Sequence, residues 1–461
     1  MRIEVVFLSG VVLTLLAMSI SVVPPALAQG SLTPPPGAPS PTMLSLSQVE
    51  PRTPVDAIHT PGDANSLFII NRPGSYYLTA NLVPTNSQYA ISIETNDVTL
   101  DLNGFTVTGI SNSSINGSGI YVPNPQIDLT IRNGVVSDWP IVGIYAFPTS
   151  NCQFEHLRLY NDQQTGIYAG TNCVILDCVA QGDGTGILGG NNCNVTHCNF
   201  LANDGQGLEL GDNSLITSCV AQDNFATGIF VGNGCVIRDC SSVTNKHVAG
   251  IVGGNNCTLS GCIVLSNIGF GISLGLTCVV DGCTVNANTG VGIFSADSAG
   301  GLYGLIIKNC SVCQNSLDGI DSGSGSLVED CAILGNATNG VSVADHSSIT
   351  GCIVKDSGAD GILVPSSCVV ANNTVMGNKG VGIHAASTGG NGYANRIDGN
   401  HVRDNGTGIK LDLSSASNVV VRNTAGNNAA GNYIVGTGNA VGTIVSDPTS
   451  TTANAWCNFQ N

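Results

Sequence analysis

The segment CVIRDCSSVTNKHVAGIVGGNN, residues Cys235–Asn256, is one unit of a repeat of about 21 residues. Four of its positions recur together along the chain: two cysteines, an asparagine five residues after the second cysteine, and a glycine followed by isoleucine or a similar residue. Each column is named here by its first member. The Cys178 column continues with Cys198, Cys219, Cys240, Cys262, Cys283, Cys310, Cys331 and Cys352, and the Cys152 column with Cys173, Cys193, Cys235, Cys257, Cys278 and Cys368. The Asn203 column continues with Asn224, Asn245, Asn267, Asn288, Asn315, Asn336, Asn378, Asn405 and Asn428, and the Gly143 column with Gly166, Gly186, Gly207, Gly228, Gly250, Gly271, Gly292, Gly319, Gly340, Gly361, Gly382 and Gly408.

The unit favours β-structure and has no room for a useful helix. It consists of short runs of strand-forming residues, each closed by Asn, Asp or Gly. One unit cannot bury its apolar side alone, so the units must stack on one another. We therefore predict an all-β fold, a parallel β-helix of 13 or 14 coils with three short strands in each. The residues expected to fill the bore are the isoleucines after the glycines and the column Ile175, Val195, Ile216, Ile237, Leu259, Val280 and Ile307.

The cysteines are expected to be mostly reduced. The Cys178 column continues as Asn373, Asn400 and Asn423. Asparagine at a tight bend binds a backbone amide of the neighbouring coil, and a buried cysteine can take its place. The alternative is a set of disulfides between neighbouring coils, which the coil spacing and an oxidising compartment both permit.

The composition excludes several classes of protein. The chain has 31 acidic and 14 basic residues, a net charge of −17 and a pI near 4.5. Such a chain lacks the basic surface of a nucleic-acid-binding protein. Apolar residues make up 42% of the chain, which argues against disorder.

The N-terminal region predicts export. Arg2, the apolar run from Val5 to Ala17 and an A-x-A pattern at Ala26–Ala28 together indicate a signal peptide at residues 1–28. A membrane anchor is the alternative, but the run is short and two prolines interrupt it. Residues 29–54 then read as a Pro-rich linker. The β-helix domain is expected at 55–461, with an N-terminal cap and first coils at 55–150, regular coils at 151–428 and a C-terminal cap at 429–461. The protein is thus expected to be secreted or held at the cell surface, with no membrane span after signal removal.

Four stretches resemble a known family. They are PGSYYLTANL (73–82), VTLDLNGFTVTG (98–109), GNAVGTIVSDP (438–448) and NAWCNF (454–459). They are similar to secreted bacterial right-handed parallel β-helix proteins of the planctomycete type, within the pectate-lyase-like superfamily. The resemblance implies the right-handed coil, and it implies that the outer face of the Gly-Ile strands corresponds to the substrate groove of lyases and hydrolases. It also suggests end caps at Phe68, Tyr76, Tyr77 and Phe105, and at Trp456 and Phe459.

Ionisable residues gather on the later part of that outer face. The candidate catalytic residues are Asp318, Asp321, Asp360, His384 and Lys410. In a lyase the three aspartates would hold Ca²⁺, with Lys410 or His384 as the base. In an inverting hydrolase Asp318 and Asp360, two coils or about 9.6 Å apart, would be acid and base. The competing interpretation is that Asp and Asn occupy turns, where they bind their own backbone. We find neither the carboxylate motifs of hydrolases nor a metal-binding motif, and Ca²⁺ is the one cofactor considered, for the lyase case.

Aromatic residues lie on the earlier part of the same face. Tyr145, Tyr168 and Phe230 follow Gly-Ile dipeptides and are candidate carbohydrate-binding residues. Ordinary exposed strand residues are the alternative reading. The sequence therefore favours an exported module that binds extracellular or cell-envelope polysaccharide. The alternatives are a polysaccharide lyase or glycoside hydrolase acting on uronic-acid polymers, and a purely structural spacer of the envelope.

Overall fold

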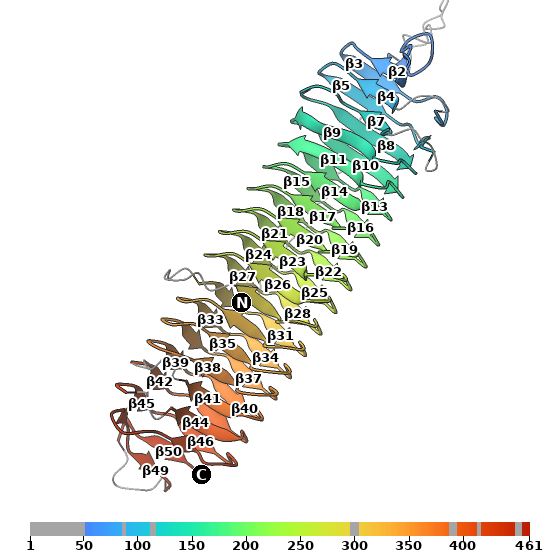
Figure 1. Ribbon diagram of the computed structural model, residues 1–461. Helices are drawn as coiled ribbons and strands as arrows, with labels where there is room; N and C mark the ends of the chain where they lie inside the picture. Colours follow the sequence, from blue (N-terminus) through green and yellow to red (C-terminus); the bar gives the residue numbers. More distant parts are fainter. Residues whose placement is uncertain are drawn as a thin grey trace, which may run out of the picture. The chain divides into compact units, whose positions relative to one another are not determined.

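Each turn of the chain contributes three short strands, and successive turns pair in parallel (Figure 1). In one coil these are β20 (Ile229–Val231), β21 (Val236–Arg238) and β22 (Ser241–Val243). Each pairs in parallel with its equivalent one coil further along the chain. The predicted parallel β-helix is confirmed, and every regular element among the described residues is a strand.

The computed structural model describes residues 51–84, 89–110, 117–295, 304–386, 394–412, 416–447 and 454–461. The expected signal peptide and residues 29–50 of the expected linker lie outside these ranges. Pro51–Asn461 forms a unit of its own. Strand pairing begins at Thr53–Pro54, which pairs with Tyr76–Tyr77.

The Gly-Ile strands form one sheet, here called sheet B. Its strands, in order along the coil axis, are β2 (Ser66–Ile70), β4 (Tyr89–Ile93), β7 (Ile120–Tyr121), β9 (Val142–Ser150), β11 (Thr165–Thr171), β14 (Thr185–Gly189), β17 (Leu208–Leu210), β20, β23 (Ala249–Gly253), β26 (Phe270–Leu274), β29 (Ile293–Ser295), β32 (Ile320–Ser322), β35 (Val341–Val343), β38 (Ile362–Val364), β41 (Val381–Ala385), β44 (Thr407–Leu411) and β47 (Tyr433–Ile434). These are about 17 turns rather than the expected 13 or 14. The count from sequence was low because β2, β4 and β47 lack the Gly-Ile dipeptide and β7 lies outside the regular cysteine repeat.

The other two strands of each coil form a larger sheet, here called sheet A. Its first row is β1 (Thr53–Pro54), β3 (Gly74–Tyr77), β5 (Val98–Asp101), β8 (Thr130–Ser137), β10 (Gln153–Tyr160), β12 (Val174–Leu176), β15 (Asn194–Thr196), β18 (Leu215–Thr217), β21, β24 (Thr258–Ser260), β27 (Val279–Asp281), β30 (Ile306–Lys308), β33 (Leu327–Glu329), β36 (Ser348–Thr350), β39 (Val369–Ala371), β42 (Arg396–Asp398), β45 (Val419–Val421) and β48 (Ala440–Val441). Its second row is β6 (Thr106–Thr108), β13 (Val179–Gln181), β16 (Asn199–Leu201), β19 (Val220–Gln222), β22, β25 (Ile263–Leu265), β28 (Thr284–Asn286), β31 (Ser311–Cys313), β34 (Ala332–Leu334), β37 (Ile353–Lys355), β40 (Thr374–Met376), β43 (His401–Arg403), β46 (Thr424–Gly426), β49 (Ile444–Val445) and β50 (Asn458–Gln460). The long strands β8 and β10 belong to both rows.

The bore is filled by the columns that the sequence predicts. Ile237 and its equivalents in the neighbouring coils are fully buried, as are the isoleucines of the Gly-Ile strands. Inward and outward side chains alternate along each short strand, as in β32, where Asp321 points outward between two buried neighbours. Sheet B therefore presents at least one outward residue per coil, and the equivalent residues of successive coils form a column.

The Asn203 column is a buried hydrogen-bonded ladder at the bend before sheet B. The Oδ1 of Asn224 accepts a bond from the backbone N–H of Asn203 at 3.1 Å and from its Nδ2 at 2.8 Å. The Nδ2 of Asn224 in turn donates to the carbonyl of Phe200 at 3.0 Å. Asn203 and Asn224 are 1% and 0% exposed, so these bonds satisfy amide groups that water cannot reach.

The ladder explains the neighbouring glycines. A Cβ on Gly207 would lie 2.7 Å from the carbonyl oxygen of Gly228 and 2.8 Å from the Nδ2 of Asn224. The Gly143 column is therefore glycine because the backbone packs directly against the ladder, with no space for a side chain.

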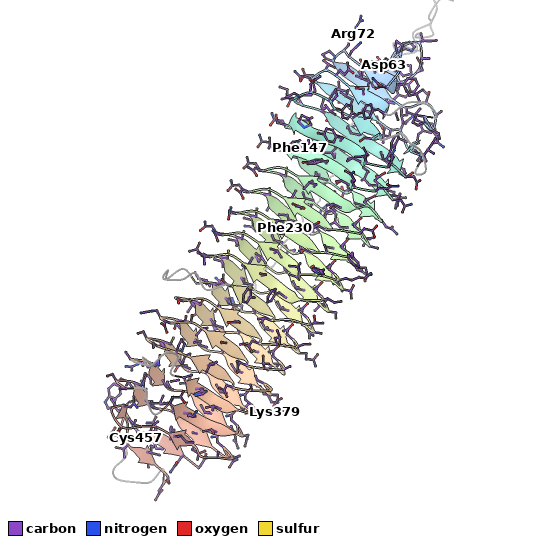
Figure 2. All side chains as sticks on the ribbon, viewed as in Figure 1. Asp63, Arg72, Phe147, Phe230, Lys379 and Cys457 are labelled. Carbon is purple, nitrogen blue, oxygen red and sulfur yellow. The ribbon has the colours of Figure 1, made fainter. Side chains whose placement is uncertain are left out.

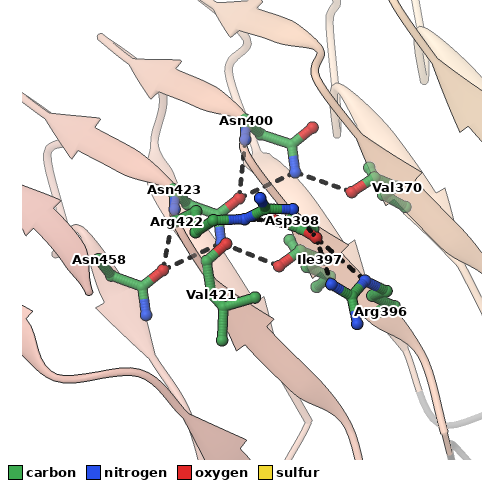
Figure 3. Close-up of polar contacts among 9 residues, drawn as sticks. All are labelled: Val370, Arg396, Ile397, Asp398, Asn400, Val421, Arg422, Asn423 and Asn458. Atoms are coloured by element: carbon green, nitrogen blue, oxygen red, sulfur yellow. Dashed lines mark hydrogen bonds and ion pairs between the residues drawn. The ribbon is translucent and has the colours of Figure 1, made fainter. Parts of the chain in front are cut away.

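The cysteine columns make the same kind of contact. The Sγ of Cys198 accepts a hydrogen bond from the backbone N–H of Cys178 at 3.5 Å. Where the column changes from cysteine to asparagine, the Oδ1 of Asn373 accepts the equivalent bond from the N–H of Cys352 at 2.9 Å. Figure 3 shows its last members, Asn400, Asn423 and Asn458. All eighteen cysteines lie in the described residues as free thiols, and Cys313 alone among them is not buried. Burial raises the pKa of Cys368 to about 11.

The C-terminal end carries an ion-pair cluster beside this ladder (Figure 3). The guanidinium groups of Arg396 and Arg422 both lie 2.6 Å from the Oδ2 of Asp398, which is 4% exposed. Phe459 lies in the last strand, paired with β46, whereas Trp456 is 58% exposed and its ring faces Arg422.

At the N-terminal end the asparagine ladder changes to aspartate. Asp183 and Asp162 occupy the next two positions; Asp183 accepts from the N–H of Asp162 at 2.8 Å, and both residues are fully buried. Burial raises the pKa of Asp183 to about 8, and burial together with the charge of Asp183 raises that of Asp162. The Oδ2 atoms of Asp162 and Asp183 have no hydrogen-bond partner among the described residues. At the asparagine positions of the ladder, an Nδ2 atom takes this place and donates a hydrogen bond. A protonated carboxyl group would donate in the same way.

We therefore expect these two aspartates to make stability depend on pH. Because the native pKa is above the unfolded one, their contribution is complete below pH ~4 and falls as the pH rises through about 8. Asp183→Asn should raise the free energy of unfolding at pH 8 by roughly 2–5 kcal/mol and change it little at pH 4. Urea unfolding at both pH values measures this. Equal effects at the two pH values would contradict it, and Asp204→Asn, beside the ladder, is the control.

Candidate functional site

The outer face of sheet B carries both groups of residues that the sequence singles out. Strand pairing places Tyr145 beside Tyr168, Phe294 beside Asp321, and His384 beside Lys410. The outward residues form one continuous column along sheet B: Tyr121, Tyr145, Tyr168, Leu188, Glu209, Phe230, Val252, Ser273, Phe294, Asp321, Ser342, Leu363, His384 and Lys410. The side chains are drawn in Figure 2, where Phe147 and Phe230 are labelled.

Five aromatic rings form a continuous cluster at the N-terminal end of this face. We call Tyr89, Tyr121, Tyr145, Tyr168 and Phe147 the tyrosine ladder. The rings of Tyr89 and Tyr121 stack with centroids 4.0 Å apart, and Tyr121 lies 5.4 Å from Tyr145. Tyr168 meets Tyr145 edge-on at 5.7 Å and Phe147 at 4.6 Å. The four tyrosines are half-buried and Phe147 is 50% exposed, so the cluster presents ring surface to solvent.

The structure brings together two of the three predicted carbohydrate-binding residues. Phe230 shares their column but is separated from Tyr168 by Leu188 and Glu209, and it is 37% exposed. Sequence reasoning missed Tyr89, Tyr121 and Phe147. A signal for Tyr121 was present, because the triplet Gly-Ile-Tyr occurs at 119–121 as well as at 143–145 and 166–168.

The five candidate catalytic residues fall into two groups. Asp318 lies just before β32 of sheet B, and Asp321 lies in the middle of that strand. Asp360, His384 and Lys410 lie together, two to four coils further along the chain. Asp318 serves the turn: its carboxylate accepts bonds from the hydroxyl of Thr338 and, at 2.8 Å, from the N–H of Asn339. These donors lie in the next coil, so Asp318 joins the turns of two neighbouring coils.

Asp360, His384, Lys410 and Asp412 form a compact cluster of alternating charge, which we call the His384 cluster. Nδ1 of His384 lies 2.7 Å from Oδ2 of Asp360, and Nε2 lies 3.1 Å from Oδ1 of Asp412. Nζ of Lys410 is 2.9 Å from Oδ1 of Asp412 and 3.2 Å from Nε2 of His384. Asp412 was not predicted, although its place two residues after Lys410 suggests the same side of the strand.

The carboxylates of the cluster favour the charged form of the imidazole. Burial, the largest single effect, disfavours the charged ring, but the hydrogen bonds to Asp360 and Asp412 outweigh it and raise the pKa of His384. Burial likewise disfavours the Asp360 carboxylate, yet its bonds from His384 and from the N–H of Val381 lower its pKa. Both ring nitrogens and the ammonium group are thus engaged by carboxylates.

Asp321 lies apart from this cluster, in a groove at the C-terminal ends of four sheet B strands. The groove has a volume of about 370 Å³, and its walls include Phe294, Ser342, Leu363 and Pro365. Burial, followed by the charge of Asp318, raises the pKa of Asp321. Within the described ranges, no group of three His, Cys, Asp or Glu side chains is arranged to hold a metal ion. The described residues also contain no helix long and apolar enough to cross a membrane.

Comparison with known proteins identifies the fold. The family described as right handed beta helix region matches four overlapping segments, residues 67–214, 118–256, 186–326 and 251–396. Together these matches span 67–396, more than half of the chain. No curated protein matches the sequence.

Several solved structures are similar to this chain at low identity. The periplasmic alginate epimerase AlgG is 11% identical with a TM-score of 0.31, over 70% of this chain and 76% of its own. The Dettilon tailspike protein is 13% identical with a TM-score of 0.28, over 86% and 60%. A GH87 α-1,3-glucanase catalytic domain in complex with tetrasaccharides is 13% identical with a TM-score of 0.29, over 85% and 70%. These likenesses are too loose to transfer an activity to this chain.

The His384 cluster yields a measurable titration. Because the native pKa of His384 is raised, the cluster's contribution to stability is complete below pH ~6.5 and is lost as the pH rises through the native pKa. We expect NMR titration of the imidazole to give a pKa above 6.5, and Asp360→Asn to lower it. A pKa of His384 at or below 6.5, or an unchanged pKa in Asp360→Asn, would contradict the arrangement.

Proposed function

The chain belongs to the right-handed β-helix family, and on that premise we propose that it is an exported module that binds polysaccharide along the outer face of sheet B. The observation that carries this proposal is the tyrosine ladder. Tyrosine rings offer an apolar face for the C–H groups of a sugar ring and a hydroxyl for its polar edge. Here Tyr121, Tyr145 and Tyr168 line up along the coil axis, and Tyr89 of β4 stacks on Tyr121, so that the rings extend over roughly 14 Å.

An extended ligand fits this arrangement better than a compact one. The ladder and the groove at Asp321 lie on the same sheet, joined by one continuous column of outward residues. A polymer that follows the column meets rings at one end and the groove towards the other. Export, proposed from residues 1–28, would place this face where extracellular or envelope polysaccharide is found.

Binding is better supported than catalysis or a purely structural role. A lyase needs a base, and both His384 and Lys410 are ion-paired with carboxylates. A hydrolase that used Asp318 would have to take a carboxylate already engaged by the turn. A spacer has no use for a contiguous set of half-exposed aromatic rings, because exposed apolar surface favours unwanted association.

Substitution in the tyrosine ladder tests the proposal. Tyr145→Ala should weaken binding to a polysaccharide that the protein retains by about fivefold or more, since an aromatic contact contributes ~1 kcal/mol or more. Affinity electrophoresis of residues 29–461 in gels with neutral, amine-bearing and uronic-acid polysaccharides measures this.

The matched control is Tyr160→Ala, which removes the same side chain from sheet A, on another face. Its mobility should equal that of the wild type in every gel. Failure to bind any polysaccharide, or equal losses in the two variants, would refute the proposal. Release of reducing ends or unsaturated uronates from the same polymers would instead establish an enzyme.

A further inference from the structure

The groove at Asp321 has the features of a ligand site. It follows the ends of β29, β32, β35 and β38, which is roughly 14 Å along the coil axis. Its walls are largely apolar, with Phe294 at one end and Leu363 and Pro365 towards the other. The ring of Phe294 is braced by Phe270, with centroids 4.5 Å apart.

One charged group in the groove lacks a partner in the described part of the chain. Asp321 is half-buried and points outward into the groove, and no described donor or cation pairs with its carboxylate. A charge that is partly removed from water is unfavourable without a partner, so this carboxylate indicates that a polar ligand completes the site.

The charge of the groove decides what kind of ligand fits. Asp318 is close enough for its charge to raise the pKa of Asp321, and its own described partners, Thr338 and Asn339, are neutral. The nearest cations of sheet B, His384 and Lys410, are paired with other carboxylates. The groove is therefore a negative site in a chain of net charge −17.

We propose that this groove binds the amine-bearing ring of an amino-sugar polymer, with Asp321 as the counter-ion of the ammonium group. The apolar walls contact the ring. A uronate in the same position would face Asp318 and Asp321 and be repelled. This inference rests on the proposed function and adds the class of polysaccharide that the face selects.

Binding of matched oligosaccharides tests the proposal. Calorimetry of residues 29–461 should give an affinity for a glucosamine hexamer about tenfold higher than for its N-acetylated form, and no binding of a galacturonate hexamer. Asp321→Asn should abolish the tenfold preference and leave the affinity for the N-acetylated hexamer unchanged. Because Asp321 must be ionised to pair with the amine, the preference should also weaken as the pH is lowered.

The controls separate this proposal from the previous one. Glu329→Gln removes a carboxylate from the next strand of the same coil, on sheet A, and should leave the preference intact. If Asp321→Asn keeps the same preference as the wild type, the assignment is overturned. Spermine has amines but no sugar ring, and the assignment is also overturned if spermine binds as tightly as the glucosamine hexamer. Binding of the N-acetylated hexamer without any amine preference overturns the groove assignment alone. No binding of any hexamer overturns the proposed function as well.

Discussion

The buried hydrogen bonds between coils at each bend are the constraint on which the rest of the structure depends. Every coil must turn sharply, and each turn leaves backbone N–H groups inside the protein. At many bends a side chain accepts a hydrogen bond from the backbone N–H of the equivalent residue in the preceding coil. Asn224 does this for Asn203, and Cys198 does it for Cys178. Because an unpaired buried amide costs on the order of 1–3 kcal/mol, these bonds help to keep the repeat in register.

The straight face of sheet B follows from that register. The ladder leaves no space for a side chain at Gly207 and its equivalents. The backbone therefore begins each sheet B strand at the equivalent position in successive coils. Outward residues are then stacked one per coil, and their chemistry changes slowly along the axis. Rings at Tyr89–Tyr168 give way to an acidic groove at Asp321 and then to the neutralised His384 cluster. A surface of this kind suits a polymer that contacts many coils.

Much of this could be predicted from sequence, because the columns report strictly repeated environments. The three strands per coil, the bore residues and the outward column all follow from the periods of Cys, Asn and Gly-Ile. The end coils could not be counted in this way, since β2, β4 and β47 satisfy the same geometry with other residues. For the site, sequence placed Asp360, His384 and Lys410 on one face but missed Asp412. The ion pairs depend on side-chain directions that periodicity does not determine. The groove at Asp321 depends on wall residues from several coils, and no single repeat reveals it.

The central claim is that cysteine acts in these columns as a hydrogen-bonding substitute for asparagine and not as a cross-link. Counting free thiols in the protein after purification and unfolding without reductant tests this most directly. The account predicts that all eighteen cysteines react with a thiol reagent once unfolded, and that before unfolding only Cys313 reacts readily. A count that is lower by several pairs, and that reductant restores to eighteen, would show that disulfides join neighbouring coils and would contradict the account.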